Sequence, residues 1–264
     1  MTYFEAALLG AVQGVCEFLP VSSSGHLALA QQLLDLDADE NLAFALRLHA
    51  ATLGAVVAAF WGDLTRLAGS LFRLKPEARL VGMLFLAMIP TGAAALLLKP
   101  HLESAMDSSA AVGAGLIATG CILFLSKRFA RLSEEKADEI EKTNALRALW
   151  IGLAQGVAVL PGVSRSGATI GTGLLLGLKG EASARFSFLL SILAISAAMS
   201  FDMLKGFENS SAPLGPSLVG AAAAFLTGLA SIRWLMRLAR LRRFDGFAYY
   251  CWAVGAAALA AALL

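Results

Sequence analysis

The residues best suited to chemistry are an arginine and several serines set within otherwise apolar sequence. Residues 155–169 read QGVAVLPGVSRSGAT, and Arg165 is the one charged residue in that stretch. A charge at membrane depth is costly and by default functional, and glycine-rich backbone around it can direct several N–H donors at one anion. A phosphate group is the obvious ligand. A tight turn between two core helices, with Arg165 reaching out to water, is the alternative.

A second copy of this pattern lies at residues 13–26, which read QGVCEFLPVSSSGH. At one constant offset the copies align Gln13 with Gln155, Ser22 with Ser164, Ser24 with Ser166, and Gly25 with Gly167. The first copy alone has Glu17 and His26, and the second has Arg165 where the first has Ser23. The chain is therefore an internal duplication in which one copy carries an acid and a base and the other carries the cation.

The composition is that of a membrane protein with several spans. The chain has 264 residues, of which 58% are hydrophobic and 15% charged, and its mean hydropathy is +0.72. The net charge of +2 says little by itself, and we expect no nucleic-acid partner. A span needs about 20 apolar residues. Six stretches qualify: 41–61, 79–98, 109–126, 183–204, 216–236 and 246–264.

Two further pairs of apolar segments are too short to cross a bilayer. They are 2–14 with 23–34 and 145–157 with 167–178, each broken by a Pro/Gly/Ser segment. We interpret them as re-entrant helix pairs, whose irregular backbone is tolerated where it is buried in protein. The predicted fold is an all-α integral membrane protein with two repeats, each a re-entrant pair followed by three spans.

The odd number of spans in each repeat predicts that the second repeat is inverted relative to the first. The domains are then a first repeat at 1–128, a polar cytoplasmic linker at 129–144, and a second repeat at 145–264. Nearly all Lys and Arg residues fall in the loops on one side, which the positive-inside rule makes cytoplasmic. Both termini and the Glu17 segment are therefore expected to face outward.

The predicted site combines both copies. Arg165 offers a planar fork of donors for phosphate oxygens. Glu17 is either a base or, with Gln13, the holder of a divalent cation, whereas His26 is base, acid or nucleophile. The expected substrate-binding residues are Gln13, Ser22, Ser24, Gly25, Ser164, Ser166, Gly167 and Thr169.

These two motifs resemble those of the BacA/UppP undecaprenyl pyrophosphate phosphatases. QGVCEFLPVSSSGH is similar to the family's (E/Q)xxxE and SSxGH region, and PGVSRSGAT to its PGxSRSxxT region. The family's functional residues carry over to Glu17, Ser22, Ser23, His26, Ser164, Arg165, Ser166 and Thr169. Gln13 stands where many members have glutamate, which puts a site with two carboxylates for Mg2+ or Ca2+ in doubt.

The resemblance implies a phosphatase of the bacterial cytoplasmic membrane that removes the terminal phosphate of undecaprenyl diphosphate and so recycles the lipid carrier for peptidoglycan synthesis. Its partners would be that polyprenyl diphosphate and membrane lipids, and a homodimer stays open. We expect Arg165 to bind the diphosphate and Ser23 to attack, activated by Glu17 and His26. Attack by water or by His26 remains an alternative. Inverted repeats are also typical of transporters, so a carrier or flippase of an anionic lipid is the rival function.

Overall fold

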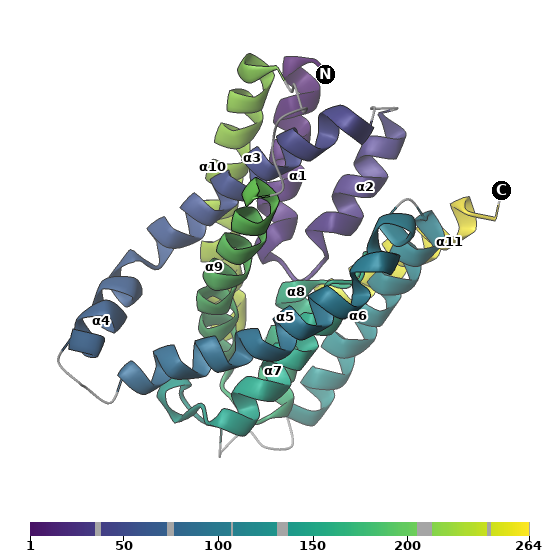
Figure 1. The fold of residues 1–264 in the computed structure, drawn as a ribbon. Coiled ribbons are helices and arrows are strands. Elements are labelled where there is room, and N and C mark those ends of the chain that lie inside the picture. The colour runs from purple at the N-terminus through teal and green to yellow at the C-terminus, as the bar shows by residue number, and fades with distance from the viewer. Residues whose placement is uncertain are drawn as a thin grey trace.

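The chain is helical throughout the part that the computed structural model describes (Figure 1). The described residues are 1–34, 38–72, 77–106, 108–130, 137–204, 213–241 and 244–263. Within these ranges the chain forms eleven α-helices, one short 3-10 helix and one isolated β-bridge. The prediction of an all-α fold is confirmed.

Four helices are long and apolar enough to cross a membrane within the described ranges. They are α5 (Ala78–Met106), α6 (Ser109–Ala130), α9 (Gly180–Leu204) and α10 (Leu214–Arg240). Four of the six predicted spans therefore lie in single long helices. The protein is a multi-pass membrane protein.

The other two predicted spans differ from a straight full-length helix. The stretch 41–61 belongs to α3 (Ala38–Ala59), which is followed at a bend of 72° by α4 (Trp61–Phe72). Asp63 and Arg66 lie on one side of α4 and Leu67 is buried, so α4 is amphipathic and suited to the membrane surface. The stretch 246–264 forms α11 (Asp245–Ala261), whose 17 residues span only about 25 Å. Of the six predicted spans, four are therefore straight, full-length helices, one is bent and one is short.

Two short helix pairs lie where the sequence predicts them. The first pair is α1 (Tyr3–Phe18) with α2 (Ser23–Leu33), and the second is α7 (Ala145–Val157) with α8 (Arg165–Leu175). A serine caps the second helix of each pair, because Ser22 Oγ accepts from Gly25 N–H and Ser164 Oγ accepts from Gly167 N–H. In Figure 1 the turn between α1 and α2 reaches the start of α8 near the middle of the molecule.

The first helix of each pair packs closely against a long helix of the other half. A Cβ added to Gly10 of α1 would lie 2.1 Å from the carbonyl oxygen of Gly220 in α10. A Cβ added to Gly152 of α7 would lie 2.0 Å from the carbonyl oxygen of Ala87 in α5. Glycine at these two positions lets the backbones approach, as in other membrane helix pairs.

The second part of the predicted linker is packed against the protein rather than solvated. Residues 131–136 lie outside the described residues, but Asp138 pairs through its backbone with Gly177 and Lys179 at the turn between α8 and α9. Ile140 and Thr143 are buried. The charged sequence concealed this contact because one apolar side chain, Ile140, provides most of it.

Candidate active site

The buried carboxylate of Glu17, at the end of α1, is the centre of the candidate site. Its Oε1 accepts a hydrogen bond from Arg165 Nη2 at 2.6 Å, although the two residues are 148 positions apart. Its Oε2 accepts from Ser23 Oγ at 2.6 Å and from Gln13 Nε2 at 3.0 Å. Four residues predicted from the two motifs therefore form one cluster.

The local helix geometry explains how this cluster forms. Gln13 and Glu17 lie one turn apart on the same face of α1, and both are buried. Ser23 and Arg165 are the first residues of α2 and α8. An arginine at a helix N-terminus is electrostatically unfavourable for the helix, but an anion there is favoured. The cluster is thus a cation beside two helix N-termini, which suits a phosphate group.

The turn that presents Ser23 is strained. Ser22 has φ 70° and ψ 100°, and no other non-glycine residue in the described ranges has a positive φ. Such backbone costs free energy and persists where surrounding contacts hold it. Here Ser22 Oγ accepts from Gly25 N–H, and the Ser22 carbonyl oxygen lies 2.8 Å from His26 Nδ1.

The contacts of His26 determine which ring nitrogen carries the proton. A carbonyl oxygen only accepts, so Nδ1 must donate to Ser22, and Nε2 of the neutral ring is left as an acceptor. Nε2 lies 2.8 Å from the Tyr250 hydroxyl of α11, which therefore donates to it. The two rings also stack, with centroids 5.5 Å apart. His26 thus joins the α2 turn to α11, and its hydrogen bonds go to Ser22 and Tyr250 rather than to Ser23 or Glu17.

Comparison with known proteins identifies the family. The family described as "Bacitracin resistance protein BacA" matches residues 6–257. The chain belongs to the BacA family. An undecaprenyl-diphosphatase of Syntrophotalea carbinolica is 40% identical over 259 residues, which cover 97% of each chain. One from Parabacteroides distasonis is 36% identical over 271 residues and 100% of each chain, and one from Methanosphaera stadtmanae is 37% identical over 268 residues and 95% of each chain.

The serines and threonine of the second BacA motif hold the backbone around Arg165. Ser166 Oγ donates to the Leu19 carbonyl oxygen at 2.9 Å and so ties α8 to the end of α1. Thr169 Oγ1 donates to the Arg165 carbonyl oxygen at 2.8 Å. Ser164 Oγ caps α8 at Gly167 and lies 3.1 Å from Ser166 Oγ. These hydroxyls are buried, whereas Ser23 and Ser24 in the first motif are half-buried and closer to an open approach.

Sequence reasoning missed four polar residues around the BacA motifs. Thr119 of α6 accepts from Ser164 N–H at 2.9 Å, and Ser187 of α9 lies 2.6 Å from Thr169 Oγ1. His49 of α3, a lone histidine in an apolar stretch, lies within electrostatic range of Glu17. Tyr250 lies in the first part of the apolar stretch 246–264, where a tyrosine is typical of a membrane-interface anchor. The signal for Thr119 and Ser187 was a hydroxyl in an apolar span, but nothing in the sequence linked Tyr250 to His26.

Glu17 offers a divalent cation one carboxylate, and beside it the buried Gln13 Oε1 has no hydrogen-bond partner. In the ranges that the structure covers, no three His, Cys, Asp or Glu side chains are grouped as metal ligands. Glu17 is the one carboxylate of the cluster, and both its oxygens are engaged by Arg165, Ser23 and Gln13. A divalent cation at this carboxylate would be repelled by the guanidinium. Glu17 as a metal ligand stays a prediction.

We expect Tyr250→Phe to lower kcat/KM about tenfold, because loss of the hydroxyl frees the His26 ring from α11. The acid limb of the pH profile should move to higher pH, since the lost O–H donor had favoured the unprotonated Nε2. The matched control is Tyr249→Phe, because Tyr249 is exposed and its ring contacts Trp252. An unchanged pH profile in Tyr250→Phe would contradict a positioning role.

Proposed function

We propose that this chain hydrolyses undecaprenyl diphosphate to undecaprenyl phosphate and inorganic phosphate. The BacA-family match over almost the whole chain and the full-length relatives named undecaprenyl-diphosphatases support this reaction. The observation that carries it is the Glu17 carboxylate, which contacts both a serine hydroxyl and an arginine contributed by the other motif. An arginine is enough to bind a phosphate group, whereas a serine hydroxyl hydrogen-bonded to a buried carboxylate is suited to form a bond to phosphorus.

In the proposed mechanism Ser23 is the nucleophile. Ser23 Oγ bonds to the terminal phosphorus as its proton passes to Glu17 Oε2, 2.6 Å away. The bond from that phosphorus to the bridging oxygen breaks, and undecaprenyl phosphate leaves with the electron pair. The proton on Glu17 passes to the departing undecaprenyl phosphate, which restores the carboxylate. Water then attacks the phosphorus of the phosphoserine and gives one proton to Glu17. The bond from phosphorus to Ser23 Oγ breaks, Glu17 returns that proton to Ser23 Oγ, and inorganic phosphate is released.

Arg165 would stabilise the charge that spreads over the equatorial oxygens of the transferred group. Among the described residues its guanidinium makes one hydrogen bond, to Glu17, so most of its five N–H donors are left for phosphate oxygens. His26 donates a hydrogen bond to the carbonyl oxygen of Ser22 in the strained turn. This hydrogen bond fixes the turn and thereby the orientation of Ser23. Its role in this scheme is positioning, which departs from the proton relay that the sequence suggested.

The direct test is phosphate release from a prenyl diphosphate by the purified protein in detergent. We expect steady turnover by the wild-type chain and none above background by Ser23→Ala. Release by Ser23→Ala at the wild-type rate would leave hydrolysis intact but remove Ser23 as nucleophile. No release by the wild-type chain, with or without added Mg2+ or Ca2+, would favour the transporter.

We propose that any Mg2+ or Ca2+ used in the reaction arrives with the diphosphate. Isothermal titration of the substrate-free protein with either ion should then show no saturable binding in the millimolar range. The physical reason is that Glu17 is already neutralised by Arg165 at 2.6 Å. Saturable binding that disappears in Glu17→Gln would contradict this expectation and restore a metal site at that residue.

We also infer that the two halves, 1–128 and 145–264, are inverted repeats. Gly10 and Gly152 occupy equivalent positions in the duplicated sequence, and each supports the same close approach to a long helix of the other half. With the bent pair α3 and α4 and the short α11 counted as membrane-inserted, each half contributes three passes. An odd number of passes inverts the second half.

The orientation that follows places both termini and the site on the outer side of the cytoplasmic membrane, with the basic loops inside. In a Cys121→Ala background, Leu263→Cys should react with a membrane-impermeant thiol reagent in intact cells. Glu141→Cys should react only after permeabilisation, and both positions are exposed. The remaining cysteines, Cys16 and Cys251, are buried. Labelling of both positions from outside would overturn the topology.

A further inference from the structure

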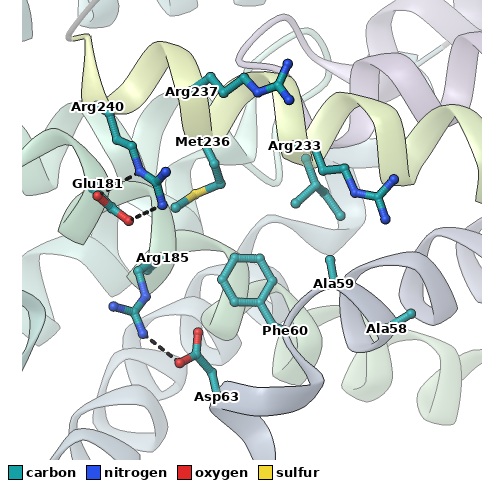
Figure 2. Close-up of a pocket in the computed structure, with 11 residues that line it drawn as sticks. Ala58, Ala59, Phe60, Asp63, Glu181, Arg185, Arg233, Met236, Arg237 and Arg240 are labelled. Atoms are coloured by element: carbon teal, nitrogen blue, oxygen red, sulfur yellow. Dashed lines mark hydrogen bonds and ion pairs between the residues drawn. The ribbon is translucent and has the colours of Figure 1, made fainter.

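A second site lies where the α3–α4 bend meets the start of α9 and the last turns of α10. It is a cavity of about 590 Å3, shown in Figure 2. Its apolar lining includes Phe60, Ile232 and Met236, and its charged lining is Asp63, Glu181, Arg185, Arg233, Arg237 and Arg240. An apolar surface edged by arginines suits a molecule with an anionic head and a hydrocarbon body.

The charges of this pocket are only partly balanced. Asp63 accepts from Arg185 at 2.6 Å, and Glu181 accepts from Arg240 at 3.0 and 2.9 Å. Arg233 and Arg237 have no acidic partner in the part of the chain that the structure describes, and Figure 2 shows no interaction joining them to the rest of the lining. The lining therefore keeps two uncompensated guanidinium groups.

The two unpaired arginines come from the same stretch of α10. Arg233 and Arg237 are four residues apart on α10, so they project from the same side one turn apart. Both are exposed, at the end of a helix long enough to span the membrane. The ends of a spanning helix lie near the phosphate groups of lipids, and basic pockets between membrane helices on the cytoplasmic side bind such headgroups.

The pocket is separate from the Glu17 cluster. Phe60 lines the pocket and contacts Phe188, with ring centroids 5.4 Å apart, and Phe188 contacts Phe18 at 5.8 Å. Phe18 follows Glu17 in the chain, and Phe18 and Phe188 are fully buried. A packed aromatic layer thus stands between the two sites, so a ligand in the pocket would not reach the catalytic residues.

We propose that this pocket binds the phosphate group of an anionic membrane lipid, held by Arg233 and Arg237 with its acyl chains along the apolar lining. The salt bridges of Arg185 and Arg240 keep the walls in place, and the two unpaired arginines supply the charge-assisted hydrogen bonds. Arginine suits this role because its fork can bind two phosphate oxygens. The site is independent of the diphosphate substrate and of the reaction proposed above.

The test measures the thermal stability of purified full-length protein in an uncharged detergent during titration with lipid. Phosphatidylglycerol should raise the melting temperature in a saturable way, whereas zwitterionic phosphatidylcholine should not. The double variant Arg233→Gln, Arg237→Gln should weaken the apparent affinity for phosphatidylglycerol at least about tenfold, equivalent to about 1.4 kcal/mol. The same experiment in the Arg165→Ala background should give the wild-type response, because the catalytic arginine is not used.

The matched control is Arg79→Gln with Arg128→Gln, which removes the same charge from two exposed residues outside the pocket. This control should bind phosphatidylglycerol as the wild type does. Equal weakening in both double variants would mean that only overall charge matters and would overturn the site. Inorganic phosphate tests the other source of the same chemistry: saturable stabilisation by phosphate but not by phosphatidylglycerol would overturn binding of a lipid.

Discussion

Arg165→Ala should lower kcat at least about 10³-fold, and Arg165→Lys at least about 10²-fold, with a prenyl diphosphate as substrate. An arginine that stabilises a transferring phosphoryl group contributes about 10³- to 10⁵-fold to the rate. Lysine keeps the charge but loses the planar fork that binds two oxygens at once. The measurement is steady-state phosphate release, with kcat and KM determined separately.

A matched control separates catalysis from ion pairing. Arg147 is also half-buried and pairs with an acid, because its Nη2 lies 2.8 Å from Asp138 at the packed end of the linker. Arg147→Lys should leave kcat within about twofold of wild type. If Arg165→Lys behaves like Arg147→Lys, Arg165 serves as the ion-pair partner of Glu17 and is not a catalytic group.

The residues of the candidate site could be predicted from the sequence because a comparison of the two duplicated copies points to them. Glu17, Ser23 and Arg165 are among the positions where the two copies differ, and they meet in one cluster. The individual contacts between these residues could not be predicted from the sequence. The sequence placed Ser23 opposite Arg165, whereas the structure places one carboxylate between them, which follows from packing of α1 against the start of α8.

The contact between His26 and Tyr250 shows where sequence patterns lose information. These residues are 224 positions apart, and a tyrosine near the end of an apolar segment is typical of a membrane-interface anchor. Only the packing of α11 beside the α2 turn distinguishes the two roles. The same limit applies to Ile140, whose burial depends on the turn between α8 and α9.

Helix lengths show a different limit. Apolar length predicted α5, α6, α9 and α10 because each is one uninterrupted run. The α3 stretch is also apolar, but its helix ends at Ala59 and an amphipathic helix leaves at 72°. A hydropathy average does not detect such a bend, because it depends on the residue types in a stretch and not on the direction of the helix axis. The bend matters because it forms one wall of the arginine-lined pocket.

Glu17→Gln should lower kcat at least about 10³-fold, while Gln13→Ala lowers it only about tenfold. Glutamine has the shape of glutamate but cannot take the proton of Ser23, and a general base contributes about 10²- to 10⁴-fold. It also removes the negative charge that orients Arg165 at 2.6 Å. Gln13 donates one neutral amide hydrogen bond to the same carboxylate, so its loss should shift the position of Glu17 without removing its chemistry.

The two variants should also differ in their pH profiles, and Glu17→Gln can be combined with removal of the Ser23 hydroxyl. Gln13→Ala should keep the limb of the kcat pH profile that reports the base, because the carboxylate is still present, whereas residual activity of Glu17→Gln should lose that limb. Combining Glu17→Gln with Ser23→Ala should add little to either single loss, since residues that act as one unit are not additive. Additive losses, or a Gln13→Ala variant less active than Glu17→Gln, would mean that Glu17 does not activate Ser23.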